Sequence, residues 1–213
     1  MYGLPTQTAQ SWNDTLELAL SFGFPHMSAY GLAVAANSPL HKRFPDPLAN
    51  YPNDEAQCLM YETLVNHCAN AGLKQYEVSN FAKPGFECRH NQTYWNNQEY
   101  YAFGVGAHRY VDGVRSANTR SFKQYLENCL VLEMEEQIDP ATAIKEDILL
   151  ALRTRAGLNF KEFYRRHGVD FMEQYAPIIE KLSSGGFIEL DKESLNLSNE
   201  GVMVSNLVLS EFF

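Results

Sequence analysis

Cysteine, basic residues and long apolar runs are scarce in this chain, and each shortage excludes a class of protein. The four cysteines include no C-x-x-C pair, which removes the strongest signal of a structural metal site. So few cysteines predict a reducing cytoplasm and not a disulfide scaffold. No apolar run reaches about 18 residues, so no transmembrane helix is expected. The opening MYGLPTQT lacks the basic and apolar regions of a signal peptide.

The charge balance is acidic. Lysine and arginine total 17 against 26 aspartates and glutamates, a formal net charge of −9 over 213 residues. This balance argues against a nucleic acid or an anionic membrane held by bulk electrostatics. A composition of 45% hydrophobic and 20% charged residues is that of a globular protein with a real core, as one large domain or two small ones.

The first third of the chain alternates between strand and helix patterns. Such alternation predicts parallel strands with right-handed crossovers, in an α/β barrel or an open sheet. The opening residues look like the end of a strand, so we expect that either the fold is unusual or an N-terminal part of the protein is missing. The predicted elements are a helix over 11–22, a buried strand over 25–32, a long loop over 33–51, a helix from 53 to the stop at Gly72, and a strand over 73–81.

Residues 82–120 hold the densest unusual chemistry, including Cys88-Arg89-His90-Asn91, Tyr94-Trp95 and Gly104-Val105-Gly106-Ala107-His108. Asp112-Gly113 predicts a hairpin turn between two strands. A helix is expected from Ser121. The glutamates at 133, 135 and 136, with Pro140, indicate an acidic linker.

The tail predicts a separate winged-helix-like domain over 141–213. Its Ile144, Ile148, Leu149 and Leu152 recur at helical spacing and are expected in its core. The tail holds eight basic and eleven acidic residues, a net charge of −3, which makes DNA binding the weaker interpretation. The expected elements are helices over 143–154, 159–167 and 171–184, a two-stranded wing over 187–190 and 195–197, and a last helix over 199–211.

Two interpretations compete for Cys88-x-His90. The pair resembles half of a metal site, but no second ligand cluster is in sight, which favours a structural role. Alternatively, a single histidine within an aromatic loop describes a haem or porphyrin pocket, in which His90 would be the axial ligand of the iron. Gly104-x-Gly106 lacks the third glycine of a dinucleotide fingerprint and more plausibly marks a close backbone approach.

Four arginines gather in this otherwise acidic region: Arg89, Arg109, Arg115 and Arg120. Guanidinium groups match the propionates of a porphyrin, whereas ordinary surface pairing with Glu77, Glu87 and Glu99 is the simpler interpretation. Glu77, at the end of a predicted strand, is a candidate general base or a polar group of the barrel.

Several segments together resemble the C-terminal half of the HemN/HemW-type radical S-adenosylmethionine proteins: YGLPTQT, HMSAYGL, YEVSNFAKPGFECRHNQTYW, YYAFGVGAH and the tail ending SNEGVMVSNLVLSEF. The resemblance implies the later part of a (β/α) barrel over residues 1–140, followed by the winged-helix-like domain. ECRHNQTYW is its most specific part and points to the haem-chaperone branch. The resemblance assigns haem binding to His90, Asn91, Tyr94 and Trp95, and S-adenosylmethionine contacts to Gly31, Gly106 and His108.

The family's [4Fe–4S] cluster is bound by a C-x-x-x-C-x-x-C motif, and no such spacing occurs here. The cluster and most S-adenosylmethionine contacts are therefore expected only with the N-terminal half, and no catalytic residue is assigned. By itself this chain is not expected to generate a 5′-deoxyadenosyl radical.

Three hypotheses follow. The first is a haem-binding protein that delivers haem to an acceptor protein. The second is an oxygen-independent coproporphyrinogen III oxidase as the full-length parent, with the arginines binding propionates. The third is a winged-helix module on nucleic acid, which the tail's charge disfavours. An open sheet edge also predicts self-association or pairing with a second chain.

Overall fold

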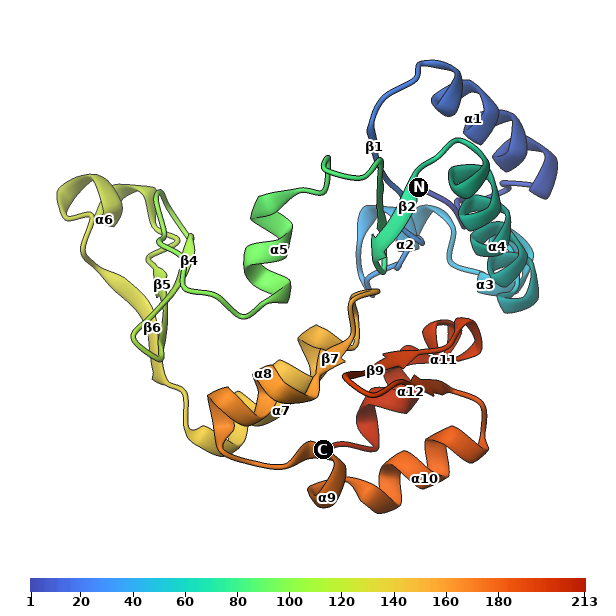
Figure 1. Cartoon of the computed structure of the whole chain (residues 1–213). Helices are drawn as coiled ribbons and strands as arrows, with labels where there is room; N and C mark the ends of the chain where they lie inside the picture. Colours follow the sequence, from blue (N-terminus) through green and yellow to red (C-terminus); the bar gives the residue numbers. More distant parts are fainter. The chain divides into compact units, whose positions relative to one another are not determined.

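The computed structural model describes all of residues 1–213, and it divides into two compact units (Figure 1). The first unit is Met1–Glu87 and the second is Cys88–Phe213. Three open three-stranded sheets are present, and none closes into a barrel. The boundary predicted between residues 140 and 141 stays a prediction. No helix combines the length and the apolar character needed to cross a membrane.

The first unit begins with helix α1 (Ala9–Ser21). Its start lies two residues before the predicted one, because Thr8 is the N-cap and Ser11 closes a capping box with it: each side chain accepts a hydrogen bond from the other's backbone N–H. The predicted loop over 33–51 also contains two short helices, α2 (Pro39–Arg43) and α3 (Pro47–Asn50). Both begin with a proline after a capping side chain, so these prolines start helices where a loop was expected.

The sheet of the first unit is antiparallel, which corrects the predicted parallel pairing. Strands β1 (His26–Ser28) and β2 (Lys74–Glu77) both pair with β3 (Asn80–Ala82) in the order β1-β3-β2. The strand predicted over 73–81 is therefore a hairpin. Parallel pairing occurs only as a bridge between Tyr2 and Gly31.

Helix α4 (Asp54–Asn70) follows the prediction closely. Asn53 caps it, and Gly72 ends it in the left-handed region at φ +76°. Trp12 donates from its indole nitrogen to the Met60 carbonyl at 2.8 Å, which joins α1 to α4. Leu59 on this helix is exposed. The buried core of this unit is Trp12, Leu16, Ala29, Met60, Leu64, Cys68, Leu73 and Phe81.

The second unit contains helix α5 (Arg89–Trp95) and then an antiparallel sheet of β4 (His108–Val111), β5 (Val114–Asn118) and β6 (Leu132–Gln137). The predicted hairpin at Asp112-Gly113 is confirmed, with φ +52° and +72° at these two residues. The helix predicted from Ser121 is α6 (Phe122–Glu127), and Ser121 is its N-cap. The expected acidic linker is instead strand β6, whose glutamates are exposed while its backbone pairs with β5.

The tail of the second unit has the predicted winged-helix-like arrangement, with a wing sheet in the order β7-β9-β8. The predicted helix over 171–184 is broken at Tyr175, where Pro177 stands in the first turn of a new helix. The last predicted helix is likewise two helices. The elements are α7 (Pro140–Ala151), β7 (Leu158–Asn159), α8 (Phe160–His167), α9 (Phe171–Gln174), α10 (Ala176–Ser184), β8 (Ile188–Leu190), β9 (Ser194–Leu197), α11 (Asn199–Met203) and α12 (Ser205–Ser210).

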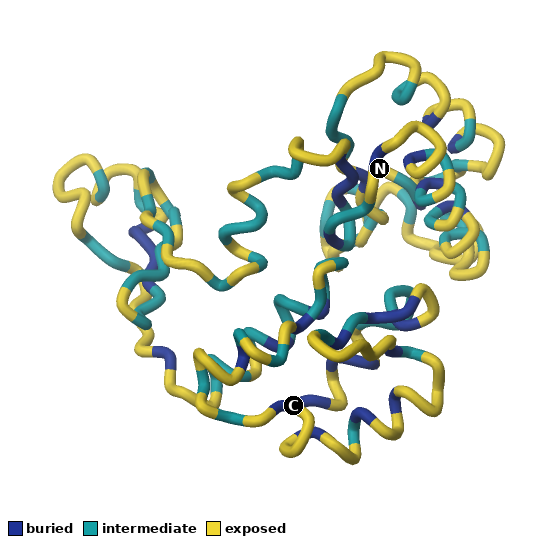
Figure 2. Tube along the Cα trace, viewed as in Figure 1, coloured by how far each residue is buried: buried dark blue, intermediate teal, exposed yellow.

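The core of this tail lies between its helices and its wing, as the buried segments in Figure 2 show. Ile148 and Leu152 are fully buried there, and Ile144 and Leu149 pack against it, which confirms the stripe predicted for α7. Phe171 stands among aromatic neighbours, with its ring centroid 5.2 Å from Phe163.

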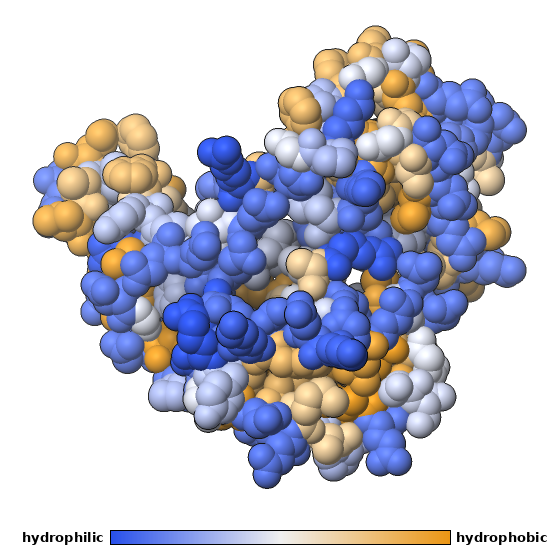
Figure 3. Space-filling model, viewed as in Figure 1, coloured by the Kyte–Doolittle hydropathy of each residue, from blue (hydrophilic) through white to orange (hydrophobic).

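Apolar side chains gather on the surface over α6 (Figure 3). Phe122 and Leu126 lie one helical turn apart, and with Phe103 and Leu130 they are 67–88% exposed. A grouped apolar surface of this kind is typical of an interaction site or of a tendency to associate.

Two glycines of the tail test its packing. Gly157 and Gly168 have nearly the same left-handed backbone, at φ +68° and +66°. A Cβ at Gly157 would overlap the Asn196 side chain and the Leu195 carbonyl, whereas a Cβ at Gly168 meets nothing within 4 Å. We expect Gly168→Ala to cost about 1 kcal/mol of unfolding free energy and Gly157→Ala about 3 kcal/mol or more. Urea unfolding followed by circular dichroism measures both; equal costs would contradict the predicted overlap.

Burial makes Cys68 chemically inert in the folded protein. Desolvation raises the pKa of its thiol to about 12, so the nucleophilic thiolate is almost absent at pH 8. Iodoacetamide should therefore alkylate the exposed Cys58 and Cys129 at pH 8 and leave Cys68 unmodified until urea unfolds the chain. Peptide mass spectrometry gives the readout. Fast labelling of Cys68 in the folded protein would show that the core of the first unit is open.

Candidate functional site

The motif predicted to bind haem lies on α5. His90 and Tyr94 are one turn apart on this helix, and their rings meet edge to face with centroids 4.9 Å apart. Tyr94 in turn contacts Tyr100 at 4.6 Å. His90 is exposed, and no hydrogen bond engages either of its ring nitrogens. The structure therefore presents an available imidazole that aromatic rings hold in place.

The C-terminal end of α5 is fixed by Asn97. This residue adopts a left-handed backbone at φ +49°, which asparagine tolerates better than most residues and which ends the helix. Its backbone N–H donates to the Tyr94 carbonyl at 2.9 Å. Its side-chain amide donates to Asp147 Oδ1 at 2.7 Å. Asn97 thus both ends the motif helix and joins it to α7.

Asp147 accepts hydrogen bonds from three residues. Besides Asn97, His167 Nε2 lies 2.8 Å from Asp147 Oδ2, and Arg166 Nη1 lies 3.2 Å from the same oxygen. The Asp147 and His167 side chains are only 11% and 10% exposed. A shielded carboxylate with several donors interacts more strongly than an exposed ion pair.

Arg166 extends this network to the backbone of the motif segment, which comprises α5 and the next two residues, Asn96 and Asn97. It donates from Nη1 to the Asn96 carbonyl at 3.1 Å and from Nε to Glu162 at 2.8 Å. Burial disfavours its charge, but Glu162 and Asp147 outweigh this effect and raise the pKa of Arg166. Hydrogen bonds from Arg165 and Arg166 lower the pKa of the Glu162 carboxyl to about 2. Glu162 and Arg166 are therefore both charged at neutral pH.

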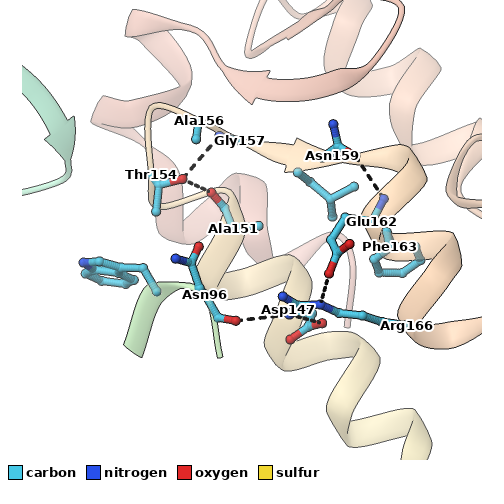
Figure 4. A pocket seen from close by; sticks show the side chains of 12 residues that line it. Asn96, Asp147, Ala151, Thr154, Ala156, Gly157, Asn159, Glu162, Phe163 and Arg166 are labelled. Carbon is cyan, nitrogen blue, oxygen red and sulfur yellow. Dashed lines mark hydrogen bonds and ion pairs between the residues drawn. The ribbon is translucent and has the colours of Figure 1, made fainter. Parts of the chain in front are cut away.

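A cavity of about 320 Å³ lies above this network (Figure 4). Trp95 and Asn96 of the motif segment form one side, and the Thr154–Gly157 turn and α8 form others. Asp147, Glu162 and Arg166 lie at its base. The volume is at the lower end of small-molecule sites, and its charged groups are already paired with one another.

Arg115 joins the sheet of the second unit to α7. Its guanidinium makes two hydrogen bonds to Glu146, at 2.8 Å and 2.7 Å, and lies 5.7 Å from the Tyr110 ring centroid. The hydrogen-bonded Glu146 carboxylate raises the pKa of Arg115. Neighbouring residues on α7 thus bind different elements, Glu146 the sheet and Asp147 the motif segment.

The other arginines do not form one cluster of free cations. Arg109 donates from Nε to Ser116 Oγ at 2.6 Å, and Arg120 lies 3.5 Å from Glu133. Arg89 has no ion pair. The observed acidic partners are Glu146 and Glu133, so the predicted pairing with Glu77, Glu87 and Glu99 is wrong.

Glu77 is buried within its own hairpin, where its carboxylate accepts hydrogen bonds from the Ser79 backbone and the Asn80 side chain. This arrangement fits the predicted polar structural role better than a general base. Cys88 is the N-cap residue of α5 and stands beside Arg89, but no group of three or more potential metal ligands forms around it.

The remaining predicted residues are placed as follows. Asn91 and Trp95 are half-buried on α5, and Trp95 faces the cavity. Gly106 has a left-handed backbone and donates to the Thr119 carbonyl at 3.0 Å, and His108 is exposed at the start of β4. Gly31 belongs to the first unit, in the bridge with Tyr2. The haem and S-adenosylmethionine roles of these residues stay predictions.

Comparison with known proteins explains the sequence pattern. Residues 138–204 match the HemN C-terminal domain family. The chain is 31% identical to the haem chaperone HemW of Bacillus subtilis (strain 168) over its whole length and 57% of that relative. It is 30% identical to the haem chaperone HemW of Lactococcus lactis subsp. lactis (strain IL1403), again over the whole chain and 56% of the relative.

The chain is similar to the HemN/HemW-type proteins over its whole length. It spans just over half the length of these relatives and corresponds to their C-terminal part. The structure of coproporphyrinogen III oxidase (HemN) from Escherichia coli matches 99% of the chain and 53% of that protein, with a TM-score of 0.79 and 16% identity. The predicted relationship and the predicted fold are thereby confirmed.

The residues of this HemN/HemW-type chain fit haem and not an iron–sulfur cluster. An exposed imidazole beside aromatic rings has the donor chemistry of an axial haem ligand. A cluster needs several converging thiolates, whereas Cys58, Cys68, Cys88 and Cys129 form no ligand group. No step through a cluster is therefore derived for this chain.

The sequence interpretation missed the residues that hold this site together, among them Asn97, Glu146 and Asp147. Asn97 had a usable signal, since an asparagine just after a helix is a common left-handed stop. Glu146 and Asp147 looked like the solvated face of an amphipathic helix, and nothing local distinguishes them from such a face.

The Arg115–Glu146 pair should contribute measurably to the stability of the second unit. Its side chains are 28% and 23% exposed, and the geometry is bidentate. A double-mutant cycle of Arg115→Lys and Glu146→Gln should give a coupling energy of about 1–2 kcal/mol by urea unfolding. The Lys123–Glu127 pair, at 4.0 Å and 85% and 64% exposed, is the control and should give almost none. Equal coupling in the two cycles would refute the special role of Arg115.

Proposed function

We propose that this chain binds haem on α5, with His90 as the axial ligand of the iron, and that it serves in haem delivery. The observation that carries the proposal is the exposed His90 imidazole, which has no hydrogen bond at either ring nitrogen and rests against Tyr94. A proximal histidine is a common haem ligand. The similar proteins of Bacillus subtilis and Lactococcus lactis are named haem chaperones, which supports the same role here.

Each motif residue has a proposed part. His90 binds the iron, and Tyr94 keeps the imidazole from rotating by its edge-to-face contact. Trp95 and Asn91 lie on the next face of α5, where they would contact the macrocycle or shield it from water. Bound haem supplies an iron centre for a nitrogen ligand and a large apolar ring for aromatic contacts.

Arginines remain candidates for the haem propionates, but not all four. Arg115 has both terminal nitrogens committed to Glu146, so it is unsuited to a propionate. Arg109 keeps its terminal nitrogens clear of any hydrogen bond, and Arg120 is 76% exposed with only a long contact to Glu133. We therefore propose Arg109, Arg120 and Arg89 as the propionate-binding candidates.

The partners implied by this function are haem or a related porphyrin and a haem-acceptor protein. The exposed apolar surface over α6 supports the predicted self-association or pairing with a second chain. A cytoplasmic location stays a prediction from the scarcity of cysteine. The oxidase alternative has in its favour only the fold shared with HemN at 16% identity.

Haem titration followed by Soret absorbance tests the proposal. The unaltered chain should bind haem saturably, and His90→Ala should weaken binding by about tenfold or more, which is about 1.4 kcal/mol. His41→Ala is the matched control, because His41 on α2 also has a ring without hydrogen bonds but lies outside the motif. Equal haem retention by the unaltered chain and His90→Ala would exclude His90 as the ligand.

A further inference from the structure

Helix α5 has few interactions within itself that would stabilise it. It has seven residues, none of them buried, and no side-chain hydrogen bond caps its start. Isolated helices of this length are unstable in water, because few hydrogen bonds offset the cost of nucleation. Contacts with the rest of the second unit must therefore set its position.

The polar contacts concentrate at the end of the helix that faces the tail. Arg166 donates to the Asn96 carbonyl at 3.1 Å, and Asn97 donates to Asp147 at 2.7 Å. Both partners lie within residues 138–204, the part that matches the HemN C-terminal domain. Two hydrogen bonds thus attach the motif segment to that domain. One uses the Arg166 side chain of the domain, and the other uses the Asn97 side chain of the segment.

Asp147 is the centre of this attachment. It follows Glu146 and precedes Ile148, which has no exposed surface and lies in the core of the tail. Its oxygens accept from Asn97, Arg166 and His167, and its side chain is 11% exposed. A carboxylate on a helix that the core immobilises is a fixed anchor for the mobile groups that bind it.

We infer that Asp147 is the positioning residue of the haem-motif helix: through Asn97 and Arg166 it fixes the direction in which α5 presents His90. The HemN C-terminal domain then fixes the position of His90, the proposed ligand of the haem iron. From Asn97 to His90 the helix spans about 10 Å at 1.5 Å per residue, so a small tilt at Asn97 displaces the imidazole. The haem part of this inference rests on the proposed function.

Paired variants test the inference without removing Asp147 itself, whose loss would leave Asn97, Arg166 and His167 without their shared acceptor. Asn97→Gly keeps the left-handed backbone and removes only the amide that binds Asp147. Arg166→Ala removes the contacts to Asn96 and Asp147. Arg165→Ala is the control, because Arg165 also binds Glu162 on α8 but contacts neither Asp147 nor the motif segment.

The first readout needs no haem. Amide hydrogen exchange of residues 93–98 should become about tenfold faster in Asn97→Gly and Arg166→Ala, and should stay within about twofold in Arg165→Ala. Unchanged exchange in the first two variants, or the same acceleration in all three, would overturn the inference. The thermal midpoint of each variant shows whether the tail remains folded.

The second readout follows the ferric haem complex by its Soret maximum and by electron paramagnetic resonance. Asn97→Gly and Arg166→Ala should bind haem several-fold more weakly with an altered axial-ligand signal, while Arg165→Ala matches the unaltered chain. In the His90→Ala background these variants should cause no further loss, because Asp147 acts through His90. A normal haem signal despite faster exchange would overturn the positioning of His90. Haem retention by His90→Ala would instead refute the proposed function, and the exchange readout would still test the attachment of α5.

Discussion

The hydrogen bonds to the shielded carboxylate of Asp147 are the interaction on which the arrangement of the second unit depends. It accepts hydrogen bonds from Asn97, Arg166 and His167, which lie before α7 and after it in the chain. Removing one partner from such a group leaves the others unmatched away from water, so the group acts as a unit. The position of the motif helix and the packing of α8 on α7 are therefore coupled.

Helix α7 distributes its contacts around its circumference. Ile148 and Leu152 bury one face in the tail, Asp147 binds the motif segment and α8, and Glu146 binds the sheet through Arg115. One short helix thus joins the sheet, the haem-motif helix and the winged-helix-like core. The C-terminal domain of this HemN/HemW-type chain is consequently part of the architecture of the motif, and not an independent appendage.

Patterns that depend on neighbouring residues were read correctly from the sequence. The Asp112-Gly113 turn, the start of a helix at Asn53 and the apolar stripe of α7 each follow from backbone or side-chain preferences within a few residues. The errors arose where local patterns are degenerate. An exposed strand rich in glutamate looks like a linker, and a tight hairpin at Glu77 looks like one continuous strand.

By itself, the sequence determined the family resemblance and the winged-helix-like tail, because each is encoded by contiguous residues. His90 was expected in an aromatic loop, whereas the structure places it on the helix α5. Only the tertiary structure decided which charges meet. Asp147 and Asn97 are 50 residues apart in the chain, and Arg115 and Glu146 are 31 apart. An acidic residue on an amphipathic helix has the same local pattern whether water or a distant donor satisfies it. Its partner is set by how the helices and the sheet pack, and that packing also decided how the haem motif is held.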